Sequence, residues 1–228
     1  MNSKLKVAIF DMDGTLVDST EAHIESWIET FRSIGVHTSY EEVSKLMGRT
    51  SEDIAKSILD MHGMRSINPS ELARRKDKLF EQEFTDRVKA FPYAKKALKA
   101  LHERGIRIAV VSSNPKQLVV KILKEKSLYE YVDVIIGQDE VSRGKPHPEP
   151  ILLVLSKLKV KPEEAVVIGD STYDVQAARA AGVIAIGVCT GISTAKELKK
   201  AGAKTVVKNL REFYEKLDPI MLLDYDVL

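Results

Sequence analysis

Six short runs of Val and Ile recur along the chain and constrain its fold more than any other feature. They are strand-length and lack polar alternation, which is typical of strands buried on both faces of a sheet. Amphipathic helical patterns separate them, and several of these end at a glycine, such as Gly105 or Gly182. This alternation predicts an α/β fold with a doubly wound parallel sheet. The runs are KVAIF, IRIAVVSS, VDVIIG, AVVIGD, VIAIGV and KTVV.

Residues 17–88 interrupt the alternation, because they contain helical patterns and no convincing strand. The segment EAHIESWIETFRSIG carries an apolar face, and Asn68–Pro69 has the form of a cap followed by proline at the first helical position. We therefore predict an all-helical cap over 17–88, inserted into a core formed by 1–16 and 89–228. The basic run Arg74–Lys76 on the last of these helices is interpreted as a solvated face.

The composition is that of a soluble globular protein, with 228 residues and a formal net charge of +2. Basic and acidic residues are interspersed, so the charge gives no argument for nucleic acid or a membrane surface as a partner. The apolar run at the N-terminus is too short for a signal peptide. Cys189 is the only cysteine, which excludes an internal disulfide and favours a reducing compartment. We expect a cytoplasmic protein.

Polar side chains follow the ends of several predicted strands, where open α/β sheets bind their ligands. Carboxylates that share a site raise each other's pKa unless a cation intervenes. A hard divalent ion, most simply Mg²⁺, fits such oxygen ligands and leaves room for a phosphate. A lysine and hydroxyl groups beside that ion suit a phosphoryl group. The residues concerned are Asp11, Asp13, Ser112, Ser113, Asn114, Asp170 and Asp174, with Lys145 in a following loop.

Four motifs carry a resemblance to a known family: DMDGTLVDS, VVSSN, GKPHPEP and VVIGDSTYDVQAARAAG. In this order they resemble the haloacid dehalogenase superfamily of phosphohydrolases, and most of all its phosphoglycolate phosphatase and β-phosphoglucomutase group. The resemblance covers nearly the whole chain. It implies a Rossmann-like core with a helical cap, and a Mg²⁺-dependent phosphatase that hydrolyses a small phosphorylated metabolite.

The resemblance also implies roles for the two acids of the first motif. Asp11 is the expected nucleophile, which forms an aspartyl-phosphate. Asp13 is the expected general acid and then base, and its backbone carbonyl is an expected Mg²⁺ ligand. The metal keeps Asp11 ionised, while the crowded Asp13 can hold a proton. An acid at position 13 favours phosphate-ester hydrolysis over dehalogenation or ion pumping within the superfamily.

Further roles are implied for the other motifs. Ser112 is expected to hydrogen-bond the phosphoryl oxygens, with Ser113 and Asn114 beside it, and Lys145 to offset the charge of nucleophile and phosphate. Asp170 is an expected metal ligand. Asp174 lies one helical turn further on and binds the metal or supports it.

Two cap residues are candidate substrate contacts. Arg49 lies in a turn that faces the active site by resemblance, and arginine suits anionic groups. His23 lies where the family often carries a histidine near the cap hinge. The preceding segment Asp18–Thr20 is interpreted as a cap for the helix that starts near Glu21.

Two alternative functions stay open: a phosphosugar mutase, and a non-hydrolysing phospho-signalling module. The mutases that this chain resembles carry an Arg where it has Ser51, and a Glu-Asp pair where it has Gly169–Asp170. Both departures favour the phosphatase. We expect a monomer or a weak homodimer. The apolar segment 217–228 could pack on the body or on a second subunit.

Overall fold

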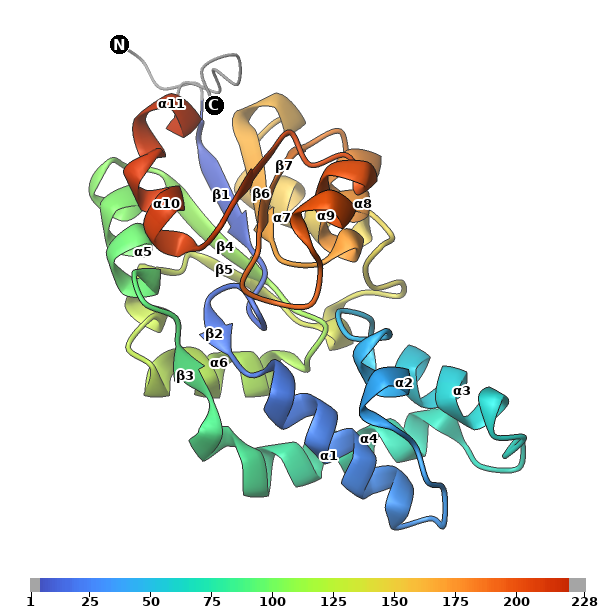
Figure 1. The fold of residues 1–228 in the computed structure, drawn as a ribbon. Coiled ribbons are helices and arrows are strands. Elements are labelled where there is room, and N and C mark those ends of the chain that lie inside the picture. The colour runs from blue at the N-terminus through green and yellow to red at the C-terminus, as the bar shows by residue number, and fades with distance from the viewer. Residues whose placement is uncertain (1–4, 222–228) are drawn as a thin grey trace.

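A six-stranded parallel sheet forms the centre of the larger lobe (Figure 1). The computed structural model describes residues 5–221. The strand order is β5-β4-β1-β6-β7-β8. From β1 the chain adds strands first on one side of the sheet and then on the other, as in doubly wound folds, so the predicted fold class is confirmed. The strands are β1 (Val7–Phe10), β4 (Arg107–Val111), β5 (Val134–Ile136), β6 (Ala165–Gly169), β7 (Ile184–Val188) and β8 (Thr205–Val207).

Helices cover both faces of this sheet. Successive strand residues point to opposite faces, so Ala8 and Phe10 pack in one apolar cluster while Val7 and Ile9 pack in another. The first cluster is completed by α5 (Ala94–Glu103), α6 (Lys116–Glu125), α10 (Leu210–Glu215) and α11 (Leu217–Met221). The second is completed by α7 (Glu149–Leu158), α8 (Thr172–Ala180) and α9 (Ala195–Ala201).

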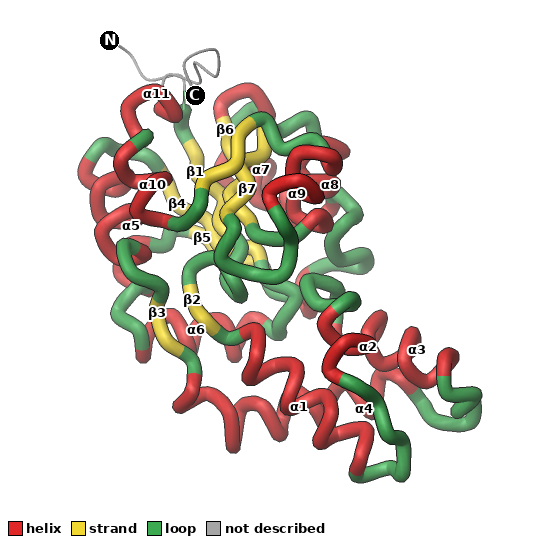
Figure 2. Tube along the Cα trace, in the orientation of Figure 1, coloured by secondary structure: helices red, strands yellow, loops and turns green. Residues whose placement is uncertain are grey.

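The chain from residue 20 to residue 79 builds a helical lobe below the sheet (Figure 2). It contains α1 (Thr20–Arg32), α2 (Tyr40–Ser44), α3 (Ser51–Met61) and α4 (Pro69–Leu79). Thr50 caps α3 and Asn68 caps α4 through their side chains. The four helices share an apolar cluster of their own, centred on Trp27, Phe31 and Ile58.

Beyond α4, the chain continues as a π-helical turn, η1 (Phe80–Phe84), and a 3₁₀ turn, η2 (Thr85–Arg87). Phe80 and Phe84 pack with Met12 and Leu16 in a cluster of the sheet lobe rather than with the helical cluster. This turn therefore ties the end of the helical lobe to the loop that follows β1.

Two very short strands join the lobes. β2 (Val17–Asp18) and β3 (Lys89–Ala90) pair antiparallel, with Val17 opposite Ala90. The expectation that 17–88 contains no strand is therefore wrong at its first two residues, which form β2, whereas β3 lies just beyond residue 88. Two residues are too few to produce a period-2 pattern, so no sequence signal announces such strands.

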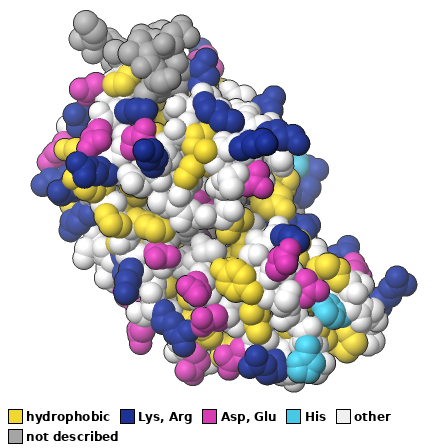
Figure 3. Space-filling view, viewed as in Figure 1, with side chains coloured by type: hydrophobic (Ala, Val, Ile, Leu, Met, Phe, Trp, Pro, Cys, Tyr) yellow, Lys and Arg dark blue, Asp and Glu magenta, His cyan; other side chains and the backbone are white. Residues whose placement is uncertain are grey.

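The C-terminal segment packs on the sheet lobe as far as the structure describes it. Leu217 and Ile220 of α11 are buried in the first apolar cluster, and 222–228 lie outside the described residues. Among residues 5–221, no helix combines the length and apolar character needed to cross a membrane. On the face shown in Figure 3, side chains of both charge signs are intermingled.

Candidate active site

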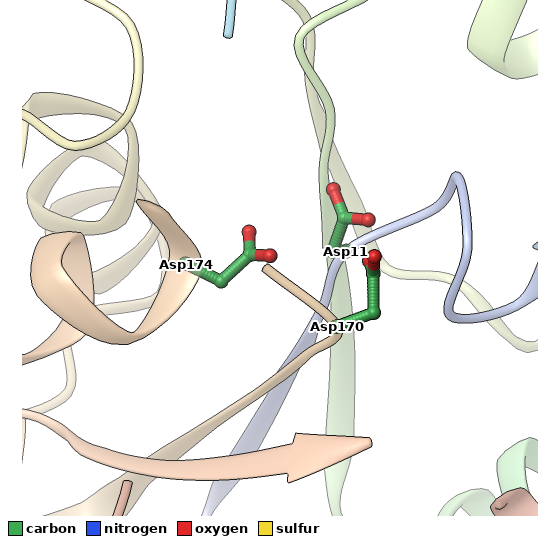
Figure 4. Close-up of side chains that lie close together, drawn as sticks. All are labelled: Asp11, Asp170 and Asp174. Carbon is green, nitrogen blue, oxygen red and sulfur yellow. The ribbon is translucent and has the colours of Figure 1, made fainter. Parts of the chain in front are cut away.

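Three buried carboxylates meet at the carboxyl ends of neighbouring strands. Asp11 directly follows β1, Asp170 follows β6, and Asp174 lies in the first turn of α8. Figure 4 shows the carboxylates of Asp11 and Asp170 side by side, with Asp174 pointing toward them from its helix. One oxygen from each lies within 4.8 Å of the others. The register brings the strand ends level, because Phe10 pairs with Ile168.

Lys145 neutralises part of this cluster. Its Nζ lies 2.5 Å from Asp11 Oδ1 and 2.6 Å from Asp174 Oδ1. Burial disfavours the ammonium, but the charges of Asp11 and Asp174 raise the pKa of Lys145, so it stays protonated. The sequence therefore predicted correctly that these residues converge, although their motifs are up to 163 positions apart (174 − 11).

The cluster still holds more negative charge than one lysine offsets. Burial raises the pKa of the Asp11 carboxyl well above its ordinary value, although Lys145 lowers it. Burial and then Asp174 raise the pKa of Asp170 to about 7. Oxygen donors with an excess of buried negative charge suit a hard divalent cation. The residues present thus fit a metal held by Asp11, Asp170 and Asp174.

Glycines make room for these carboxylates. Gly14 has a φ of +79°, and a Cβ there would lie 2.7 Å from Asp170 Oδ2. A Cβ at Gly169 would lie 2.5 Å from Asp174 Cγ. An acidic residue at position 169 would therefore need the space that Asp174 occupies, so this chain supplies its carboxylate from α8 instead.

Asp13 lies beside the cluster but in a different environment. Its Oδ1 accepts hydrogen bonds from Ser19 Oγ at 2.6 Å and from His23 Nε2 at 3.2 Å. Its Oδ2 accepts one from Asn114 Nδ2 at 2.6 Å. The interpretation of Ser19 as a capping side chain is wrong: it precedes α1 but makes no capping hydrogen bond. Its hydroxyl is directed to Asp13 instead.

These contacts favour the ionised form of Asp13. Burial alone would raise its pKa, but His23 and the hydroxyl of Ser19 lower the pKa of Asp13 below its ordinary value. The expectation that crowding lets Asp13 hold a proton is therefore wrong for the protein without substrate. The interactions with His23 and Ser19 outweigh the effect of burial on this carboxyl.

Lys76 is a buried residue of this site that the sequence motifs do not single out. The basic run was interpreted as a solvated face, yet Lys76 is only 2% exposed. Its Nζ lies 2.8 Å from His23 Nδ1. Burial lowers the pKa of Lys76, whereas Asp77 and Asp13 raise it. The ammonium form of Lys76 can only donate, and beside it His23 Nε2 carries the ring proton and donates to Asp13. A signal existed, because Lys76 falls between Leu72 and Phe80 on one helical stripe.

The other predicted residues surround the same place. Ser112 Oγ lies 3.4 Å from Asp13 Oδ2 and accepts the backbone N–H of Asn114. Ser113 Oγ donates to the carbonyl of Gly48 at 3.0 Å, which joins the two lobes. Arg49 follows Gly48, and its guanidinium donates to Ser57 of α3.

A cavity of about 40 Å³ lies between Asp11 and the helical lobe. Seven of the predicted residues line it, together with Lys76 and the apolar side chains of Trp27, Met47 and Ile54. Ser112, Lys145 and Asp174 are not part of its lining. The predicted residues in the lining are Asp11, Asp13, His23, Arg49, Ser113, Asn114 and Asp170.

Comparison with known proteins identifies the family. Residues 8–188 match the family described as haloacid dehalogenase-like hydrolase, so the chain belongs to that family, as the four motifs predicted. It is 31% identical over 208 residues to a phosphorylated carbohydrates phosphatase of Thermotoga maritima, covering 90% of this chain and 94% of that protein. It is 31% identical over 206 residues to a phosphoglycolate phosphatase of Salmonella typhi, covering 80% of each.

A solved structure gives the same fold. A candidate β-phosphoglucomutase from Bacteroides vulgatus superposes with a TM-score of 0.83 at 27% identity, over 97% of this chain and 90% of that chain. The chain is thus similar to proteins named as phosphatases and to one named as a candidate mutase.

Proposed function

We propose that this protein is a Mg²⁺-dependent phosphatase that hydrolyses small phosphate monoesters through an aspartyl-phosphate on Asp11. The observation that carries the proposal is the separation of two acids at one strand end. Asp11 lies against Lys145 and the acidic cluster, whereas Asp13 is held by Ser19, His23 and Asn114. Two carboxyl groups in different environments suit a nucleophile and a proton carrier. The names of the phosphatase relatives support the same activity.

In the proposed first step, an oxygen of Asp11 attacks phosphorus and the bond to the leaving oxygen breaks. Asp13 gives that oxygen a proton. The phosphoryl dianion beside Asp13 favours its protonation, because a neighbouring negative charge raises a carboxyl pKa. In the second step, Asp13 takes a proton from water as the water oxygen attacks phosphorus and the bond to Asp11 breaks. Ser112 and Asn114 are the proposed phosphoryl contacts.

The proposed metal ligands are the carboxylates of Asp11, Asp170 and Asp174, with the backbone carbonyl of Asp13. Bound there, Mg²⁺ would offset negative charge on the phosphoryl group and on its ligands. Lys145 would complete this neutralisation through its contacts with Asp11 and Asp174.

The cavity favours a small leaving group. Its volume of about 40 Å³ corresponds to a few water molecules. Arg49 and Lys76 give one wall two cationic groups, and Trp27 gives it an apolar surface. We propose that His23 orients Asp13 through its hydrogen bond to Oδ1. We also propose that Arg49 contacts an anionic part of the substrate.

The helical lobe would act as a cap that closes over this cavity. Its separate apolar cluster and the narrow β2–β3 connection support the division into a core, 1–16 and 89–228, and a cap, 17–88. A cytoplasmic location and a monomer or weak homodimer complete the proposal.

A panel of phosphate esters tests the activity. With Mg²⁺, we expect the protein to release inorganic phosphate from phosphoglycolate and small sugar phosphates without any bisphosphate activator, and to lose that activity in EDTA. Phosphate release across the whole panel that stays at background would refute the phosphatase.

The alternative function, a phosphosugar mutase, is tested by following one sugar phosphate by NMR. Its support is the fold shared with the candidate mutase; against it stand Ser51 and the filled space at Gly169. Phosphorus NMR of β-glucose 1-phosphate, with and without a bisphosphate, distinguishes the two. Efficient conversion to glucose 6-phosphate with little free phosphate would establish the mutase.

Metal binding should stabilise the fold independently of turnover. Mg²⁺ relieves repulsion among buried carboxylates, and a ligand at about 100 times its dissociation constant stabilises a protein by about 2.7 kcal/mol. We expect the melting temperature to rise by roughly 5–10 °C over its value in EDTA. Asp170→Asn should largely remove this shift, whereas Asp60→Asn, an exposed position on α3, should keep it. An unchanged wild-type melting temperature at millimolar Mg²⁺ contradicts the metal assignment.

A further inference from the structure

Gln138 of the sheet lobe touches the helical lobe at a point outside the predicted site. It begins the 3₁₀ turn η4 (Gln138–Glu140) after β5. Its Nε2 donates to Asp77 Oδ2 of α4 at 3.3 Å, and its Oε1 accepts the backbone N–H of Ser51 in α3 at 3.3 Å. Both bonds use the amide in one orientation, since a flipped amide would place an oxygen against the Asp77 carboxylate.

Asp77 links Gln138 to buried residues of the helical lobe. Its Oδ1 accepts the hydroxyl of Ser51 at 2.8 Å and lies 3.5 Å from Lys76 Nζ. Lys76 in turn contacts His23, whose ring donates to Asp13. The side chain of Asp77 is 13% exposed and that of Lys76 is 2% exposed. A carboxylate at this depth depends on its few partners for its orientation.

The backbone of Gln138 contacts the same site from the other side. Its N–H donates to the carbonyl of Asn114 at 3.0 Å, and the Asn114 side chain donates to Asp13. Two lines of contacts therefore run from Gln138 to Asp13. One passes through Asn114 within the sheet lobe, and the other passes through Asp77, Lys76 and His23 in the helical lobe.

We propose that Gln138 is a positioning residue that latches the closed cap: by holding Asp77 and Ser51, it places the Lys76–His23 pair against Asp13. The inference rests on the proposed function, since that function gives Asp13 its role. Gln138 does not itself line the cavity, and it contacts neither Asp11 nor Asp13; it holds the lining residues Ser51 and Asn114 from behind. It acts by favouring the closed arrangement, and activity scales with the fraction of molecules in that arrangement.

Reversing the polarity of the latch tests it. Gln138→Glu cannot donate to Asp77 and places two carboxylates together, so we expect kcat/KM to fall about ten- to a hundred-fold. Adding Asp77→Asn restores a donor opposite the new acceptor. In the double-mutant cycle, the double variant should therefore retain at least about ten-fold more activity than the product of the two single losses predicts. Losses that simply multiply would overturn the pairing.

Trp27 supplies a readout that needs no turnover. It is the only tryptophan of the chain and lines the cavity, 1% exposed. Acrylamide should quench its fluorescence more in Gln138→Glu than in the wild type, and the double variant should reverse this. Gln117→Glu, the same change at an exposed position of α6, should alter neither quenching nor kcat/KM.

The two ideas fail separately. A wild-type protein without phosphatase activity refutes the proposed function, while quenching still tests the latch. An active wild type whose Gln138→Glu variant matches it in both kcat/KM and quenching refutes the latch alone.

Discussion

Asp11→Asn is expected to lower phosphate release by about four to six orders of magnitude, the range seen when a covalent nucleophile is removed. An amide is a poor nucleophile and a poor metal ligand, so the covalent step loses its attacking atom. The fold should persist, because the change removes a buried acid whose pKa burial raises and leaves Lys145 paired with Asp174. The rates of phosphate release by the wild type and by Asp11→Asn, both at saturating Mg²⁺, measure this loss.

Two controls make this result specific. Asp18→Asn, an exposed position seven residues away (18 − 11), should keep wild-type turnover. Beryllofluoride with Mg²⁺ should bind the wild type as a phosphoryl mimic, detected by fluorine NMR, and should not bind Asp11→Asn. Turnover by the Asn variant within about ten-fold of wild type would remove Asp11 from the nucleophile's role.

Asp13→Asn is expected to lower kcat by about a hundred- to ten-thousand-fold for alkyl phosphates, the usual contribution of a general acid or base. The asparagine oxygen can still accept from Ser19 and His23, and its amide nitrogen can donate to Asn114 once the Asn114 amide turns its oxygen toward it, so the site should keep its shape. p-Nitrophenyl phosphate should be affected less in its first step, because nitrophenolate leaves without a proton. Comparing pre-steady-state release of the leaving group from both esters measures the difference.

Comparison of the two ester types can also contradict the proposed role of Asp13 as a general acid. A loss of the same size in leaving-group release for both would mean that position 13 serves geometry alone. Mg²⁺ should still raise the melting temperature of Asp13→Asn, since the carboxylates of Asp11, Asp170 and Asp174 remain. This separates proton transfer from metal binding.

The residues that end strands could be predicted from the sequence because topology fixes where they go. Asp11, Asp170 and the loop from Ser112 to Asn114 follow strands of one parallel sheet, and parallel strands bring their carboxyl ends to one edge. The number of residues between these positions does not affect the prediction, because the topology of the sheet alone brings them together. The sheet itself was predictable because each strand is apolar on both faces.

Residues whose roles depend on tertiary contacts could not be predicted in this way. Ser19 had a sufficient local explanation as a helix cap, and only the position of Asp13 shows that its hydroxyl goes elsewhere. Lys76 belongs to a basic run that suggested solvent, and its burial requires α1 and α4 to pack together. Gln138 carries no motif, and its partner Asp77 is 61 positions away. Such pairings depend on how the lobes dock.

The pairing of β2 with β3 has a consequence for how such a chain can change. Val17 lies opposite Ala90, so the helical lobe leaves and re-enters the sheet lobe at neighbouring points. A segment with adjacent ends can be lengthened, shortened or exchanged without moving the strands that flank it. The β2–β3 pair thus forms a fixed attachment point for the inserted segment. Grafting a foreign helical segment between Asp18 and Lys89 could alter which esters are accepted while the carboxylates at the sheet edge stay in place.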